Sequence, residues 1–140
     1  MDINTQQEFL ANKDKPNLRI LCNVQFNNDP YKIMDLSSYT HIGTWDMRGC
    51  EDMEHMFKNC KNIPPEIGNW DTSNVVYMVE TFKNSRNIPP EIGNWNMRNV
   101  DTLYGAFSGA TGIPDTLEKW DLRDCDDVRK IFKDAKPQKL

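Results

Sequence analysis

A tryptophan recurs at a constant interval of 25 residues through most of the chain. All four tryptophans obey this interval without an insertion or a deletion: Trp45, Trp70, Trp95 and Trp120. Four phenylalanines repeat with the same period: Phe57, Phe82, Phe107 and Phe132. A period of this size is typical of repeat proteins, in which each unit is too small to bury its own apolar face and packs against the next unit. The repeat therefore constrains the fold more than any other feature of the sequence.

The apolar spacing changes within each repeat. Residues 45–48 and 95–98 alternate apolar and polar side chains, which predicts a short strand with the tryptophan facing inward. In the next segment Val75, Met78 and Phe82 follow the i, i+3, i+7 spacing of one helix face, which predicts a short helix. Asn59, Asn84 and Gly109 follow the phenylalanines and suit a left-handed helix end. We expect the Ile-Pro segment, as in the duplicated NIPPEIGNW of 62–70 and 87–95, to return in an extended conformation because proline blocks further helix.

These segments predict an α/β solenoid of four stacked 25-residue turns, similar to leucine-rich repeats, with short parallel strands and short helices over residues 42–135. Residues 1–41 lack the tryptophan column and are expected to form an N-terminal α/β cap, made of a short helix and a β-hairpin. Residues 136–140 form a charged C-terminal tail. The predicted repeat core contains the tryptophans, the phenylalanines and a third column: Met53, Met78, Leu103 and Val128.

Two stretches of the repeat carry a family resemblance. NWDTSNVVYMVETFKNS and TWDMRGCEDMEHMFKNC resemble the Trp-Asp-x-Ser-Asn-Val-x-x-Met-x-x-x-Phe repeat of BspA-like proteins, the mycoplasma lipoprotein type. The resemblance covers about residues 42–135, and similar repeats occur in bacterial surface proteins, protists and large DNA viruses of amoebae. It implies a solenoid used for surface display and protein interaction, and it brings no catalytic residue to this chain.

Composition and charge exclude several classes of function. The net charge is −4 with acids and bases interspersed, which argues against a nucleic-acid surface. No apolar run has the length of a membrane span, so we expect no membrane insertion. The N-terminus lacks the pattern of a signal peptide or a lipid-attachment cysteine, which predicts an intracellular or virion-associated protein. The four cysteines form no CxxC pair, and we expect neither a metal nor a cofactor.

A column of charged residues forms the candidate interaction strip. It follows the tryptophans and comprises Asp46, Arg48, Asp71, Arg98, Asp121 and Arg123. One interpretation is a recognition strip for a charged partner. The other, which we favour, is that each carboxylate caps the next turn or pairs with a neighbouring arginine. A metal site at His55 with Glu51 and Glu54 is the weaker alternative to a solvated helix face.

The sequence as a whole favours a non-enzymatic repeat scaffold that contacts other proteins, as a structural or minor component of a larger particle such as a virion. No local motif provides a catalytic arrangement. The alternative is a ligand-binding or adhesion module for a glycan or a surface protein. Exposed aromatic side chains would support that alternative, and the candidates are Tyr31, Tyr77 and Tyr104.

Overall fold

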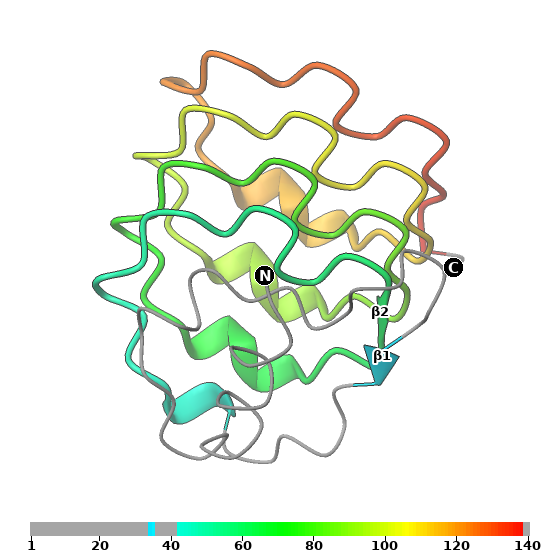
Figure 1. The fold of residues 1–140 in the computed structure, drawn as a ribbon, viewed down its shortest axis with the longest axis horizontal. Coiled ribbons are helices and arrows are strands. Elements are labelled where there is room, and N and C mark those ends of the chain that lie inside the picture. The colour runs from blue at the N-terminus through cyan, green and yellow to red at the C-terminus, as the bar shows by residue number, and fades with distance from the viewer. Residues whose placement is uncertain (1–33, 36–41, 139–140) are drawn as a thin grey trace, which may run out of the picture.

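The computed structural model describes residues 34–35 and 42–138 of the chain. The chain winds in successive coils that lie one above another, and Figure 1 shows the colour advancing from cyan to red up the stack. We number the coils by their residues: coil 1 is 42–64, coil 2 is 65–89, coil 3 is 90–114 and coil 4 is 115–138. The predicted helix and most of the predicted hairpin of the N-terminal cap lie outside the described residues, as do tail residues 139–140.

Equivalent positions of neighbouring coils pair in parallel. Isolated parallel bridges connect Asp52 with Tyr77, Tyr77 with Thr102 and Thr102 with Asp127, so that one residue of every coil joins a single ladder. A two-stranded parallel sheet adds β1 (Met34–Asp35) to β2 (Cys60–Lys61) of coil 1, with Met34 opposite Cys60. The 25-residue period of the sequence is therefore the step from one coil to the next.

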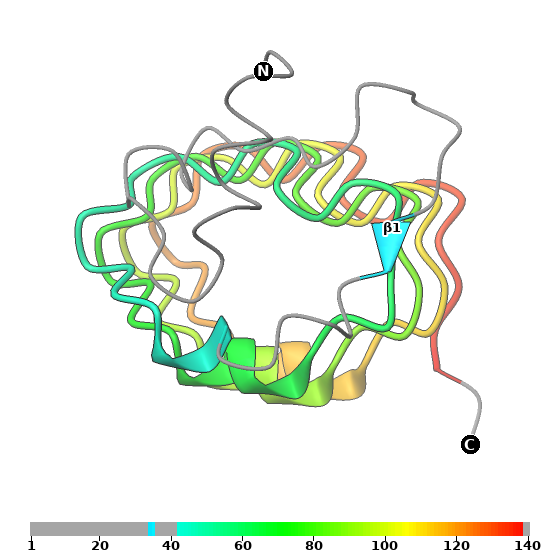
Figure 2. The same cartoon turned by 60° about the horizontal axis from the view of Figure 1, so that its bottom comes forward.

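Each coil contains a short 3-10 helix, and these helices line one side of the stack (Figure 2). They are η1 (Ile42–Thr44), η2 (Pro65–Asn69), η3 (Pro90–Asn94) and η4 (Asp115–Lys119). The Ile-Pro segment is extended at Pro64, as predicted, but the 3-10 helix that begins at the second proline was not predicted. Pro64 has φ −62° and ψ 135°, while Pro65 begins η2. Proline is compatible with the first position of a helix, where the missing N–H would have had no helical partner.

The predicted helix between each tryptophan and phenylalanine is absent from the described coils, and so is the predicted strand at 45–48. In coil 1 the N–H groups of Met53, His55 and Phe57 donate upward to carbonyl oxygens of coil 2 at 2.8–3.1 Å. They do not donate to the residue four positions earlier, as an α-helix requires. His55 and Asn59 have φ of 59° and 61°. These left-handed residues rotate the chain so that Met53 and Phe57 both face inward, which reproduces helical spacing without a helix.

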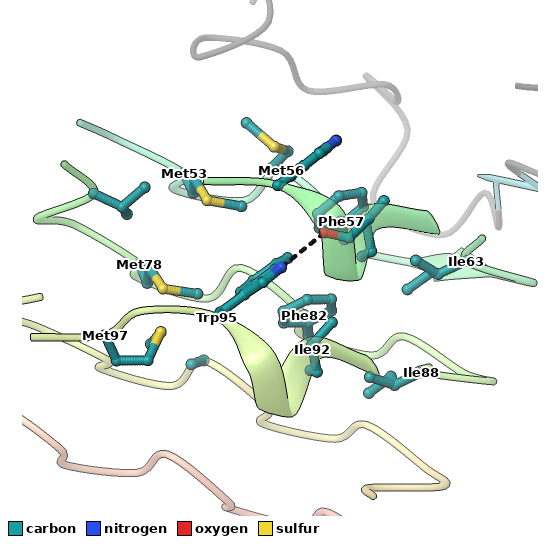
Figure 3. Packing of buried hydrophobic residues seen from close by; sticks show 14 of the residues in the cluster. Met53, Met56, Phe57, Ile63, Met78, Phe82, Ile88, Ile92, Trp95 and Met97 are labelled. Carbon is teal, nitrogen blue, oxygen red and sulfur yellow. Dashed lines mark hydrogen bonds between the residues drawn. The ribbon is translucent and has the colours of Figure 1, made fainter. Parts of the chain in front are cut away.

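Aromatic rings stack through the core in two parallel columns. Neighbouring tryptophan rings lie 6.4, 6.2 and 6.5 Å apart from Trp45 to Trp120. Phenylalanine rings lie 5.2, 5.1 and 5.7 Å apart from Phe57 to Phe132. Figure 3 shows Trp95 and Phe82 with Met78 and Met97 on one side and Ile88 on the other. Such offset aromatic contacts add to the stabilisation that apolar burial provides.

The tryptophans also fix the vertical register through their indole N–H groups. Trp95 Nε1 donates to the carbonyl oxygen of Ile67 in the coil below, at 2.8 Å (Figure 3). Trp70 donates in the same way to Ile42, and Trp120 to Ile92, also at 2.8 Å. A buried indole N–H without an acceptor would cost stability, so this bond both satisfies the donor and sets the height of coils 2, 3 and 4.

Glycine allows the 3-10 helices to approach one another closely. A Cβ atom at Gly93 would lie 2.7 Å from the Cβ of Thr116 in coil 4. Gly43 and Gly68 are equally tight against Glu66 and Glu91. The equivalent residue of coil 4 is Glu118, which is exposed. The requirement for glycine therefore holds only where another coil lies above.

Two predicted core residues lie outside the core. Val128 is 46% exposed and Phe132 is 49% exposed, whereas Leu103 and Phe107, their equivalents one coil below, are fully buried. The 25-residue period predicts the same role for these residues as for their equivalents in the lower coils. Coil 4 has no described coil above it, so the upper surfaces of Val128 and Phe132 remain open to solvent.

Candidate functional site

In coils 1 and 2, each aspartate of the candidate interaction strip accepts hydrogen bonds from the residue two positions later in the same coil. Asp46 Oδ1 accepts from the backbone N of Arg48 at 3.1 Å and from its Nε at 2.9 Å, while Arg48 Nη2 donates to Oδ2 at 2.7 Å. The side-chain hydrogen bond from Arg48 lowers the pKa of Asp46 to about 2. Asp71 uses its carboxylate in the same position to accept from Ser73 N at 3.0 Å and from Ser73 Oγ at 2.6 Å.

The second half of the strip follows the same local pattern. Arg123 Nη2 donates to Asp121 Oδ2 at 2.6 Å, and the side chain of Arg123 lowers the pKa of Asp121 to about 2. Arg98 Nε lies 4.0 Å from the same carboxylate, while its backbone N donates to Asn96 Oδ1 at 3.1 Å. Each coil thus uses the residue after its tryptophan to hold the next turn.

A second polar cluster bridges coils 1 and 2. His55 Nε2 lies 2.7 Å from Glu80 Oε1, and Lys83 Nζ donates to Glu80 Oε2 at 2.8 Å. Burial would raise the pKa of Glu80, but the hydrogen bonds from Lys83 and His55 outweigh it, so the pKa is lowered. Sequence analysis grouped His55 with Glu51 and Glu54 and missed Glu80, although a separation of 25 residues puts both at one position of the repeat. No group of three metal-binding side chains occurs among the residues that the structure describes.

The upper face of coil 4 carries an apolar hollow of 490 Å³. Its floor and walls are mainly apolar, with Asp115, Glu118 and Gln138 among its lining residues. The apolar residues come from the last turns of the stack: Ile113, Pro114, Leu117, Trp120, Leu122, Ile131, Phe132 and Pro137. Exposed apolar surface that is rimmed by polar groups often marks a contact with another macromolecule. We call this surface the end face.

Sequence analysis did not single out the end face as a site. It placed Trp120 and Phe132 among the core residues, although both line the hollow. One signal in the sequence marks the position: the glycine column Gly43, Gly68 and Gly93 is followed by Glu118. This change occurs where the described stack has an upper surface instead of another coil.

Comparison with known proteins identifies a family. A model described as "Mycoplasma protein of unknown function, DUF285" matches residues 26–139. No curated protein and no solved structure was found to match the chain. Within the described part of the chain, no helix is long and apolar enough to pass through a lipid bilayer.

Proposed function

This chain belongs to the family of mycoplasma proteins of unknown function, DUF285, and we propose that it is a non-enzymatic repeat scaffold that contacts other proteins. In this proposal the stacked coils form a short leucine-rich-repeat-like solenoid, akin to the BspA-like repeats that the sequence resembles. The scaffold would present its surfaces within a larger assembly. Two observations support this proposal. The sequence repeats one pattern, and the described surface has locally paired charged groups but an exposed apolar end face.

One observation carries the proposal: a wide apolar surface is left open at the end of a well-packed stack. Phe132 is 49% exposed although the three phenylalanines below it are fully buried. Elsewhere the carboxylates after the tryptophans are engaged locally, as with Asp46 and Arg48 at 2.7 Å. Protein contacts are typically built on such an apolar centre with a polar rim.

Glycan binding has weaker support as an alternative. A sugar-binding surface usually offers exposed aromatic faces, and Tyr77 is 49% exposed. The ring of Tyr104 in the next coil is partly occupied, because the guanidinium carbon of Arg129 lies 5.4 Å from its centroid. Tyr31 lies outside the described residues. Within the described ranges Tyr77 is the one exposed tyrosine, and a single ring makes a poor platform for a sugar chain.

The proposal is tested by asking whether the protein has a protein partner at all. The purified chain, carrying a photo-crosslinker on the exposed face of coil 4, would be incubated with extract from its own source, and crosslinked species identified by mass spectrometry. We expect a small set of specific adducts that excess unlabelled chain competes away. A chain that stays monomeric and yields no competed protein adduct would contradict the proposal.

A further inference from the structure

The three interfaces between coils use the same backbone hydrogen bonds. Four alternate N–H groups of the lower coil donate to four carbonyl oxygens of the coil above. In the lowest interface the donors are Met53, His55, Phe57 and Asn59, and the acceptors are Tyr77, Val79, Thr81 and Lys83, at 2.8–3.1 Å. The next two interfaces repeat this arrangement, for example from Phe82 N to Ala106 O at 2.7 Å and from Phe107 N to Ile131 O at 2.8 Å.

Coil 4 presents the same four donors with no described coil above them. At the equivalent positions are Val128, Lys130, Phe132 and Asp134, and their N–H groups have no acceptor among the described residues. Lys130 and Asp134 keep the left-handed conformation of the lower coils, with φ of 57° and 58°. The edge is therefore already shaped as the lower half of a coil interface, with its donors in register.

An acceptor for an indole lies on the opposite side of the same face. The carbonyl oxygens of Ile42, Ile67 and Ile92 each accept an indole N–H from the coil above. Leu117 holds this position in coil 4, and among the described residues its oxygen accepts only the backbone N–H of Trp120. Between this oxygen and the four donors lies the 490 Å³ hollow, lined by Trp120 and Phe132.

We propose that the end face binds a segment of a second protein that carries the same Trp-to-Phe pattern as the repeats. The segment would place a tryptophan on Trp120 with its indole N–H on the Leu117 oxygen. Its carbonyl oxygens would accept from Val128, Lys130, Phe132 and Asp134, and its phenylalanine would cover Phe132. The proposal rests on the proposed scaffold function and deepens it, because it names the surface and the chemistry of the partner.

Glu118 limits how much of a repeat the partner contributes. In the lower coils this position is glycine, because atoms of the next coil occupy the space that a side chain would need. A Cβ atom at Gly93, for example, would lie 2.7 Å from the Cβ of Thr116. A glutamate excludes a further 3-10 helix packed in that way. The bound segment therefore begins after such a helix and runs from the tryptophan to the phenylalanine.

A second copy of this chain is the less suitable occupant. Two end faces brought together would oppose N–H donors with N–H donors. In a head-to-tail contact, the lower edge of coil 1 would have to pair with the end face, yet β1 of the same chain already pairs with Cys60 and Lys61 there. An extended segment from a different protein meets neither obstacle, and strand addition of this kind is a common mode of recognition.

The direct test uses a labelled peptide with the sequence of residues 68–85, GNWDTSNVVYMVETFKNS, which forms the upper side of the interface on coil 1. Fluorescence anisotropy would follow its titration with the folded chain. We expect saturable binding, and loss of binding when Trp70 and Phe82 of the peptide are both replaced by alanine. Absence of saturable binding up to about 1 mM chain would overturn the proposal.

Matched variants of the protein locate the contact. Phe132→Asp places a charge on the end face, and Tyr77→Asp makes the same change at a side chain that is equally exposed, at 49%. We expect Phe132→Asp to weaken peptide binding about tenfold or more, and Tyr77→Asp to change it less than about twofold. Equal effects of the two variants would overturn the assignment. Circular dichroism of both variants checks that they remain folded.

Two further outcomes separate this inference from the proposed function. Concentration-dependent self-association that Phe132→Asp abolishes would make a second copy the occupant and overturn the choice of a separate partner. If the crosslinking experiment finds protein partners and their capture is unchanged by Phe132→Asp, the end-face inference fails while the scaffold function stands. If it finds none, the scaffold function itself fails.

Discussion

Coil 3 and coil 4 have nearly the same pattern of side chains but differ in what lies above them. Leu103 and Phe107 of coil 3 are fully buried, whereas Val128 and Phe132 of coil 4 are 46% and 49% exposed. Residue type alone therefore does not decide whether a repeat position belongs to the core. Burial comes from the next coil, as expected for a structure whose stability is a sum over neighbouring units.

The largest expected effect comes from the same truncation made in the middle of the stack and at its end. Phe82→Ala removes a ring packed between two other phenylalanine rings at 5.2 and 5.1 Å. We expect it to lower the free energy of unfolding by about 3–5 kcal/mol. Phe132→Ala removes a ring that contacts phenylalanine on one side only, and its cost should be less than half of this. Urea denaturation of both variants provides the measurement, and similar costs would contradict the comparison.

The glycine column supplies the next test. Gly93→Ala forces a methyl group against Thr116, where a Cβ would lie 2.7 Å from backbone and side-chain atoms. We expect a cost of about 1–3 kcal/mol from overpacking. Glu118→Ala changes the equivalent position of coil 4, where the side chain is exposed, and should cost less than about 0.5 kcal/mol. Thermal denaturation of the pair would detect the difference, and an unchanged Gly93→Ala melt would mean that the 3-10 helices are further apart than described.

The polar bridge between coils 1 and 2 should produce a smaller, pH-dependent effect. The lowered pKa of Glu80 means that its contribution to stability is complete above the pKa of the unfolded chain and is lost as the pH falls through the folded-state pKa. Glu80→Gln should therefore flatten the acid limb of the stability curve and cost about 1 kcal/mol at neutral pH. Glu51→Gln, at an exposed carboxylate of coil 1, serves as the control. A variant with an unaltered acid limb would show that Glu80 is not responsible.

Much of the stack follows from the sequence, because the period identifies which residues occupy equivalent positions. The separation of 25 residues is the step between Trp70 and Trp95, and also between His55 and Glu80. The local conformation does not follow in the same way. Left-handed φ at Asn59 and His55 fits residue types that adopt it more often than most, but the same conformation at Glu80 is unusual. Sequence alone does not show these turns, so the four-residue spacing of Met53 and Phe57 is read as one face of a helix.

The end face was hidden from sequence reasoning for a related reason. A period marks the inward positions of every copy alike, so Phe132 was grouped with Phe57, Phe82 and Phe107. Only the position of a copy within the stack shows whether its inward side is covered. The replacement of glycine by Glu118 is the one local change that reports this position, and its meaning depends on the close contact between Gly93 and Thr116.

Amide hydrogen exchange, followed residue by residue, tests the central claim most directly. The claim is that each coil accepts the backbone N–H groups of the coil below it, whereas the equivalent N–H groups of coil 4 have no acceptor among the described residues. The N–H groups of Leu103, Gly105, Phe107 and Gly109 donate to coil 4 and should exchange slowly. Those of Val128, Lys130, Phe132 and Asp134 should exchange far faster, and should slow when the peptide of residues 68–85 is added. Equal protection of the two sets in the free chain would contradict the account.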